Sequence, residues 1–424
     1  MSKATKFLWA ILSAACLMQS ANIDAKGGGG TTTPVDTLPI NLQAEIALSE
    51  DILGSLSLSG NTIAANCRYT SATGVLMNAM CMLQKTATGW VLQGKVSPLP
   101  AASKLVREPV LNGNTLLIPV YDPITTNYEY YVFVRNTTGL WVQQTKIVPT
   151  AGEVFGSWAG LSGDTLAIAA SSPTGLPNGG AAVFQRTTTT TGVAWTRQAS
   201  LKLPVGNLYA PSVALSGDTA VVTGSNNGID GAAYVYKRTG TLWVQQAKLV
   251  SNDTTPFSDG FGYSSAISGD NIIIGAPYAA GKNPKYSAWG TDGRYWPGYA
   301  SVAGAAYTYH RTNGIWKQEA KLERSLTAAN PMDYFGNDVV ANGDAVMVRA
   351  AGSNDRAASV YVYQRSLTGT WPLVSKVDPE GTYISLTLPG FDRSIGLEGN
   401  TYVSAGRHNL LGQPLKRRIF VFNK

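Results

Sequence analysis

The feature of this chain that most restricts its fold is a short pattern that recurs seven times. In each copy a glycine is followed by Asp or Asn, and a β-rich run comes next; the glycines are Gly60, Gly113, Gly163, Gly217, Gly269, Gly343 and Gly399. Eight residues before each glycine stands a large apolar residue: Ile52, Leu105, Phe155, Tyr209, Phe261, Phe335 and Phe391. A period of about 50 residues made of short strands predicts a radial repeat array such as a β-propeller.

The fourth copy shows most clearly how one repeat is built. Its expected strands are 209–215, 219–223, 232–238 and 243–250. Ser216-Gly217-Asp218 makes the first turn, in which Gly217 tolerates positive φ and Asp218 can cap the turn. Four short strands joined by polar turns predict one antiparallel sheet, and hence one propeller blade.

The last copy is incomplete, because the chain stops at Lys424 where a fourth strand should begin. The missing strand is found at the other end, where Gln43-Ala44-Glu45-Ile46 aligns with residues 246–249 and 319–322. Pairing this strand with the last blade would close the ring and leave no open sheet edge there. The sequence therefore predicts an all-β, seven-bladed β-propeller of four-stranded antiparallel blades over residues 40–424, and an open solenoid would need no such exchange.

Residues 1–25 read as a secretory signal peptide, with Lys3 and Lys6 before the apolar run 7–18. Lipidation at Cys16 is the alternative, although Ser13 replaces the aliphatic residue that such signals prefer. Residues 26–39 form a Gly/Thr/Pro linker. We expect export to the periplasm, the outer surface or the medium, and no later segment is apolar enough to cross a membrane.

Cys67 and Cys81 are the two cysteines beyond the signal, and both belong to the first repeat. A hairpin that turns near Gly74 would place them directly opposite each other on the second and third strands. An exported protein with an even number of cysteines favours a disulfide. Two buried thiols are the alternative.

The motifs FG at 155–156, 261–262 and 335–336 and GAP at 275–277 resemble the FG-GAP repeat family, and especially its bacterial members. The resemblance covers about residues 40–424 and is weaker in the first two repeats. Its wider kin includes the propeller of integrin α subunits, which implies a role in extracellular recognition or cell adhesion. The Ser-Gly-Asp turns are too short to supply the six to eight oxygen ligands of Ca²⁺, so we expect no metal site.

The composition and motifs argue against nucleic-acid binding and catalysis. The net charge of +7 is scattered, with 416–418 the only tight basic cluster. The histidines His310 and His408 have no catalytic motif beside them, and we expect both at the surface. We predict a non-catalytic protein without a cofactor. A polysaccharide lyase or hydrolase that uses carboxylates of the central channel, such as Asp338, is the less favoured alternative.

Six tryptophans recur at the start of the expected fourth strands: Trp90, Trp141, Trp195, Trp243, Trp316 and Trp371. Stacking on sugar rings is one interpretation of this series. Packing between blades is the simpler one, because each ring falls at the same place in the repeat and large rings bury much apolar surface.

One segment, 279–303, interrupts the repeat, because Gly269 and Gly343 are 74 residues apart and the other intervals are 50 to 56. It contains aromatic and basic residues that are typical of binding hot spots: Lys285, Tyr286, Trp289, Arg294, Tyr295, Trp296 and Tyr299. We expect this loop to bind an extracellular or cell-surface protein, or alternatively a glycan that stacks on Trp289 and Trp296, and the protein to be monomeric. A plug over the propeller mouth is the structural alternative.

Overall fold

The structure of the protein is a computed structural model. It describes residues 41–97, 105–106, 108–171, 179–189, 192–204, 212–226, 229–252, 259–279, 287–289, 295–300, 303–324, 334–351, 359–377, 395–408 and 416–423. The chain divides into two compact units, Met1–Asp36 and Thr37–Lys424, and all of these residues belong to the second. The signal peptide and the linker expected from the sequence lie outside the described residues.

Within the described residues, the strands form seven four-stranded antiparallel blades. Blade 1 contains β2 (Asp51–Ser59), β3 (Thr62–Thr70), β4 (Leu76–Thr86) and β5 (Gly89–Val96). Blade 2 contains an inner strand divided into β6 (Leu105–Val106) and β7 (Val110–Asn112), then β8 (Thr115–Asp122), β9 (Asn127–Arg135) and β10 (Trp141–Ile147). Blade 3 contains β11 (Val154–Ser162), β12 (Thr165–Ser171), β13 (Gly180–Thr189) and β14 (Gly192–Lys202).

The remaining blades follow the same order from the inner to the outer strand. Blade 4 contains β15 (Val213–Ser216), β16 (Thr219–Asn226), β17 (Ile229–Thr239) and β18 (Leu242–Leu249). Blade 5 contains β19 (Ser264–Ser268), β20 (Asn271–Ala276), β23 (Ala305–Thr312) and β24 (Ile315–Leu322). Blade 6 contains β25 (Phe335–Asn342), β26 (Ala345–Ala350), β27 (Ser359–Gln364) and β28 (Leu373–Val377). Blade 7 contains β29 (Ile395–Glu398), β30 (Thr401–His408), β31 (Lys416–Asn423) and β1 (Asn41–Ile46).

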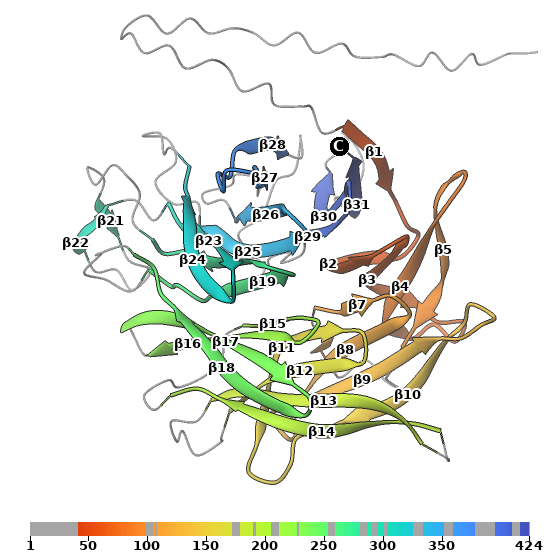
Figure 1. Ribbon diagram of the computed structural model, residues 1–424. Coiled ribbons are helices and arrows are strands. Elements are labelled where there is room, and N and C mark those ends of the chain that lie inside the picture. The colour runs from red at the N-terminus through yellow and green to blue at the C-terminus, as the bar shows by residue number, and fades with distance from the viewer. Residues whose placement is uncertain are drawn as a thin grey trace, which may run out of the picture. The chain divides into compact units, whose positions relative to one another are not determined.

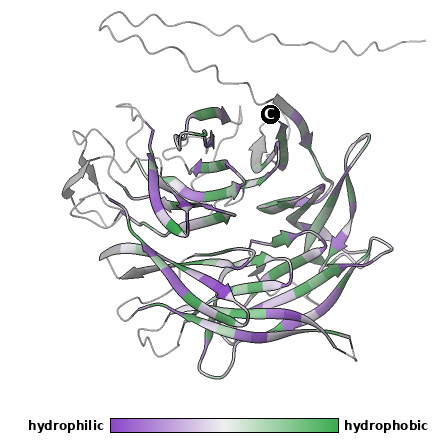
Figure 2. Ribbon diagram, viewed as in Figure 1, coloured by the Kyte–Doolittle hydropathy of each residue, from purple (hydrophilic) through white to green (hydrophobic). Residues whose placement is uncertain are grey.

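The hydrophobic core lies between the blades. Seven clusters of buried side chains each join two neighbouring blades, from blades 1 and 2 round to blades 7 and 1. Second strands such as β20 and β26 are buried along their whole length, whereas the outer strand β18 is largely exposed. Figure 2 colours the ribbon of Figure 1 by the hydropathy of each residue. In it the outer strands β18 and β24 carry hydrophilic stretches. The predicted closed propeller is therefore confirmed.

The N-terminal strand β1 closes the ring as predicted. It pairs antiparallel with β31, from Asn41 opposite Asn423 to Ile46 opposite Ile419. Glu45 also forms an ion pair of 2.6 Å with Arg418. Ile46 is buried in the cluster between blades 7 and 1, so the closing strand contributes to that core as well as to the sheet.

The recurring glycines adopt the backbone conformation that the sequence predicts. All seven have φ between 53 and 58°, the left-handed region that favours glycine. Of the large residues that precede them, Ile52, Phe155, Phe261 and Phe335 are buried. The side chains of Leu105, Tyr209 and Phe391 lie outside the description.

The two cysteines are close together, but the predicted register between them is wrong. The hairpin has residues 71–75 as its turn and is centred on Thr73, so Cys67 faces Ala79 and Cys81 faces Ala65. The cysteines are diagonal neighbours with a Cα–Cα distance of 5.8 Å, and the structure contains a bond between their sulfur atoms. Both side chains are buried in the cluster between blades 7 and 1.

Candidate binding face

The order of the strands divides the loops of the propeller between two faces. Turns from the first to the second strand and from the third to the fourth lie on one face. Connections from the second to the third strand, and from each blade to the next, lie on the other. The segment 279–303 connects β20 to β23 and so belongs to the second face, which we call the insertion face.

The insertion forms additional secondary structure where the sequence predicts a loop. Its strands β21 (Ser287–Trp289) and β22 (Tyr295–Ala300) make a two-stranded antiparallel sheet, in which Trp289 is the partner of Tyr295. Trp289, Tyr295, Trp296 and Tyr299 therefore lie on one hairpin, although their side chains are outside the description. Lys285, Tyr286 and Arg294 lie outside the described residues.

Both ends of the insertion are anchored to blades 5 and 6. The amide of Gly304 donates to the carbonyl of Ala279, and the amide of Phe335 donates to the carbonyl of Ala303, each at 3.0 Å. Ala279 and Ala303 are buried. A Cβ atom on Gly304 would lie 2.1 Å from the carbonyl oxygen of Phe335, so this close approach of two backbones requires glycine.

Three tyrosines meet beside this anchor. The ring centroids of Tyr263 and Tyr278 are 6.0 Å apart with planes at 85°, and those of Tyr278 and Tyr334 are 6.0 Å apart with planes at 87°. Tyr278 is 44% exposed, and the other two are half-buried. Sequence reasoning missed this tyrosine cluster. The available signal is that each member adjoins a repeat motif, as in FGY at 261–263, GAPY at 275–278 and YFG at 334–336.

Blade 6 carries two charged side chains on the strands that follow Tyr334. Asp338 on β25 and Arg349 on β26 are backbone partners, and both are buried. Nη1 of Arg349 donates to Oδ1 of Asn337 at 3.3 Å, and the amide of Asn337 donates to the carbonyl of Tyr334 at 3.1 Å. The positions equivalent to Arg349 in the other blades hold uncharged residues: Asn66, Pro119, Ala169, Thr223, Gly275 and Ala405. Blade 6 therefore departs from the repeat next to the insertion.

The inner strands of all seven blades line a central cavity of about 380 Å³. Its lining includes Glu108, Asp338 and Glu398, which come from three different blades, and no lysine, arginine or histidine. Burial raises the pKa of Glu398. Across the residues that the structure describes, no three acidic, cysteine or histidine side chains are grouped so that they could hold a metal ion.

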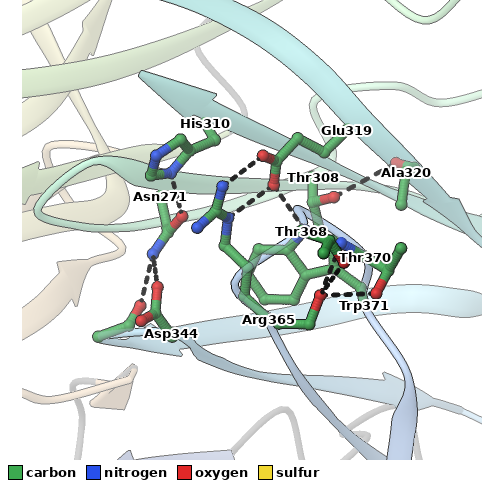
Figure 3. A network of polar contacts seen from close by, with 12 residues as sticks. Asn271, Thr308, His310, Glu319, Ala320, Asp344, Arg365, Thr368, Thr370 and Trp371 are labelled. Carbon is green, nitrogen blue, oxygen red and sulfur yellow. Dashed lines mark hydrogen bonds and ion pairs between the residues drawn. The ribbon is translucent and has the colours of Figure 1, made fainter. Parts of the chain in front are cut away.

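His310 belongs to a polar network between blades 5 and 6 and is not the plain surface residue that the sequence predicts (Figure 3). Its Nδ1 lies 2.7 Å from Oδ1 of Asn271, whose Nδ2 donates to Asp344 at 2.9 Å. In the same network Glu319 accepts from Arg365 and from Nε1 of Trp371. Burial tends to raise the pKa of Glu319, but these hydrogen bonds outweigh it and hold the pKa below its ordinary value. The side chain of His408 is outside the description.

The recurring tryptophans join neighbouring blades, as predicted. The indole N–H of Trp195, Trp243 and Trp316 donates to Gln144, Gln198 and Gln246 of the preceding blade, at 2.8 to 3.0 Å. Arg238 lies over the ring of Trp243 and forms an ion pair with Asp218 in the turn of its own blade. These contacts give the series a structural role.

Comparisons with known proteins agree with the fold. The model of the FG-GAP repeat family matches residues 243–309. The β-propeller domain of the Trilobed protease from Pyrococcus furiosus is 10% identical over 89% of this chain and 94% of its own, with a TM-score of 0.52. A chain of a mitotic checkpoint complex is 7% identical over 95% and 99%, with a TM-score of 0.53. Likenesses at this identity show a shared fold alone.

Other known proteins are less similar to this chain or do not match it. A prolyl endopeptidase is 13% identical with a TM-score of 0.46, and this chain covers 47% of its length. No curated protein sequence matches the chain. Among the described residues there is no helix with the length and apolar character to span a bilayer.

Proposed function

Because this chain is an FG-GAP-repeat β-propeller, we propose that it is a non-catalytic, exported binding module, which contacts an extracellular or cell-surface protein through the insertion face. The observation that carries the proposal is the insertion between β20 and β23. It adds a hairpin of its own to blade 5, and buried alanines anchor both of its ends. The other intervals between recurring glycines are 50 to 56 residues, so the other repeats have no insertion of this length.

Other loops of the insertion face offer apolar surface for a protein partner. Exposed apolar residues lie on three blades or the connections that follow them: Leu76 (48%), Ile124 (90%), Val148 (49%) and Val250 (43%). A stable protein interface buries about 800 Å² on each partner, which requires loops from several blades. These side chains support contact over a broad part of the face.

Two further parts of the proposal are independent of the partner. No catalytic motif stands beside His310 or His408, which favours a binding role over a lyase or hydrolase. Export rests on the basic and apolar run of residues 1–25, and a bond between Cys67 and Cys81 is compatible with an oxidising compartment. Cell fractionation with N-terminal sequencing of the mature chain tests export directly.

The partner is tested by capture of surface proteins on the purified mature protein. One variant replaces residues 280–302 with a short Gly-Ser turn. A control variant carries Leu242→Ser and Ile315→Ser, which remove exposed apolar side chains at the starts of β18 and β24, next to the turns of the opposite face. We expect the wild type and the control to capture the same protein and the insertion variant to lose it. Equal capture by all three would contradict the proposal.

Glycan binding is the second candidate function, because the half-exposed tyrosine cluster favours it. A glycan array with the same three proteins tests this alternative. Signals that disappear only in the insertion variant would support a lectin-like propeller whose site includes the hairpin.

A further inference from the structure

We infer that the cluster of Tyr263, Tyr278 and Tyr334 is a carbohydrate-binding subsite, in which the ring of Tyr278 stacks on the C–H face of a sugar. This inference rests on the proposed binding role of the insertion face. The subsite consists of residues outside the insertion. An experiment can therefore contradict the subsite without contradicting the proposed role of the insertion, and the reverse.

Tyr278 is held in position before any ligand arrives. Its ring makes edge-to-face contacts with Tyr263 and Tyr334, with centroids 6.0 Å away in each case. Because the ring remains 44% exposed, it offers a surface whose orientation is already set. Stacking on such a ring costs little side-chain entropy, which favours binding of a small rigid ligand.

The backbone around Tyr278 is built to accept this ring. A Cβ atom on Gly260 would lie 2.6 Å from Cδ2 of Tyr278, so the ring lies against bare backbone at that point. The φ of Gly260 is 71°, which also favours glycine. Pro277 stiffens the chain immediately before the tyrosine.

Tyr334 is held in an unfavourable conformation. Its φ of 51° lies in the left-handed region, which bulky residues rarely adopt. Such conformations are unfavourable and cluster at ligand clamps and active sites. The hydrogen bond from the amide of Asn337 to the carbonyl of Tyr334 closes the turn that maintains this conformation.

The same turn also contains a polar side chain, that of Asn337. Asn337 follows Tyr334 by three residues, and its side-chain oxygen accepts from the buried guanidinium of Arg349. This contact orients the amide, whose NH₂ group can donate to a sugar hydroxyl. An aromatic surface beside a few oriented polar groups is the usual composition of a small-ligand site.

The small area of exposed aromatic surface at Tyr278 favours a sugar over a protein side chain as the ligand of this cluster. Tyr263 and Tyr334 are half-buried beside Tyr278, so the cluster presents mainly one ring. One ring matches the apolar face of a single pyranose. A protein hot spot instead needs a surrounding apolar area that excludes water.

The test is a glycan array followed by titration calorimetry with the glycan that gives the strongest signal. Tyr278→Ala removes the platform and is expected to weaken binding about 10-fold or more, equivalent to about 1.4 kcal/mol. Tyr278→Phe keeps the ring and should bind within about threefold of the wild type. Tyr121→Ala, which removes a half-buried tyrosine from blade 2, is the control and should bind normally. Thermal unfolding of each variant verifies the fold.

Two outcomes would overturn the inference. One is a silent array with the wild type, together with capture of a surface protein that depends on Tyr278, which would leave the proposed protein-binding function intact. The other is glycan binding that Tyr278→Ala leaves unchanged in a folded protein. Loss of glycan binding in the Tyr278→Ala variant, with retention in the Tyr278→Phe variant, would establish the subsite even if residues 280–302 prove dispensable.

Discussion

The turns after six of the seven inner strands join neighbouring blades, each through a single side chain. The residue before the recurring glycine accepts a hydrogen bond from the glycine amide of the next blade, as Ser216 does from Gly269 at 3.1 Å. Among the residues that the structure describes, six such bonds are formed, and their acceptors are Ser59, Asn112, Ser162, Ser216, Ser268 and Asn342. The seventh position holds Glu398, at the junction of blades 7 and 1. The repeat therefore encodes contacts between blades as well as turns.

Replacing a turn glycine with alanine tests the conformational requirement by itself. The φ of Gly217 is 53°, and an added Cβ would meet no atom within 4 Å, so Gly217→Ala introduces backbone strain without a clash. We expect a loss of about 1–2 kcal/mol in the free energy of unfolding, measured with urea. Gly94→Ala is the matched control, because Gly94 lies in open space outside the left-handed region. Equal effects of the two substitutions would refute the argument.

Glu398 should make stability depend on pH in a direction set by its burial. Burial raises its pKa above the ordinary value of 4.5, so the folded state favours the protonated form. Its contribution to stability is present below about pH 4.5 and is lost as the pH rises through the folded-state pKa. Glu398→Asn removes this charge and supplies the acceptor found at Asn342. We expect the melting temperature of the variant to exceed that of the wild type by more at pH 7 than at pH 4. An equal difference in melting temperature at the two pH values would contradict the expected role of Glu398.

Among the elements, the outer strands combine exposure with specific contacts between blades. Trp316 on β24 is buried, and its Nε1 donates to Oε1 of Gln246 on β18 at 3.0 Å. Trp316→Phe keeps a large ring and loses this bond, which should lower the free energy of unfolding by about 1 kcal/mol. Trp316→Ala should lose about 3–5 kcal/mol. Urea unfolding measures both. A Trp316→Phe variant with normal stability and impaired ligand binding would contradict the structural role.

The hairpin of β3 and β4 gives a second test at this scale. A bond between Cys67 and Cys81, 14 residues apart, should stabilise the protein by about 3 kcal/mol. Mass spectrometry of the mature protein before and after reduction shows whether the bond forms, since reduction adds two hydrogens. The double variant Cys67→Ala and Cys81→Ala is then expected to unfold at a lower urea concentration. If the native thiols react fully with an alkylating agent, the expectation fails.

The elements also show why some features were predictable from the sequence and others were not. The blades and the closing strand could be predicted, because each copy repeats the same turn and the same apolar positions. The register of Cys67 and Cys81 could not, since a turn of 71–75 shifts the pairing by two residues. The tyrosine cluster could not, because Tyr263, Tyr278 and Tyr334 come from three separate segments. Only the fold brings these three tyrosines together, and they are not part of the pattern that the repeats share.

On the scale of the whole molecule, the ring is held closed without a covalent link between its ends. Blade 7 takes three strands from the C-terminus and one from the N-terminus. The core between blades 7 and 1 depends on Ile46 of β1, Ile419 of β31 and the buried cysteines of blade 1. Closure of the ring therefore depends on strands from both ends of the propeller. Because β1 covers the edge of β31, its loss would expose a strand that can pair with another chain.

Two truncated proteins test this closure. A chain that begins at Thr37 keeps the whole compact unit and should match the full-length protein in urea unfolding and in elution as a monomer. A chain that begins at Ala47 lacks β1, and with it the pairing to β31 and the ion pair between Glu45 and Arg418. We expect lower stability and concentration-dependent oligomers, detected by light scattering. A synthetic peptide of residues 41–46 should restore the monomer by adding the missing strand, as in other cases of strand addition. A stable monomer without β1 would show that the remaining interfaces between blades are enough to hold the ring.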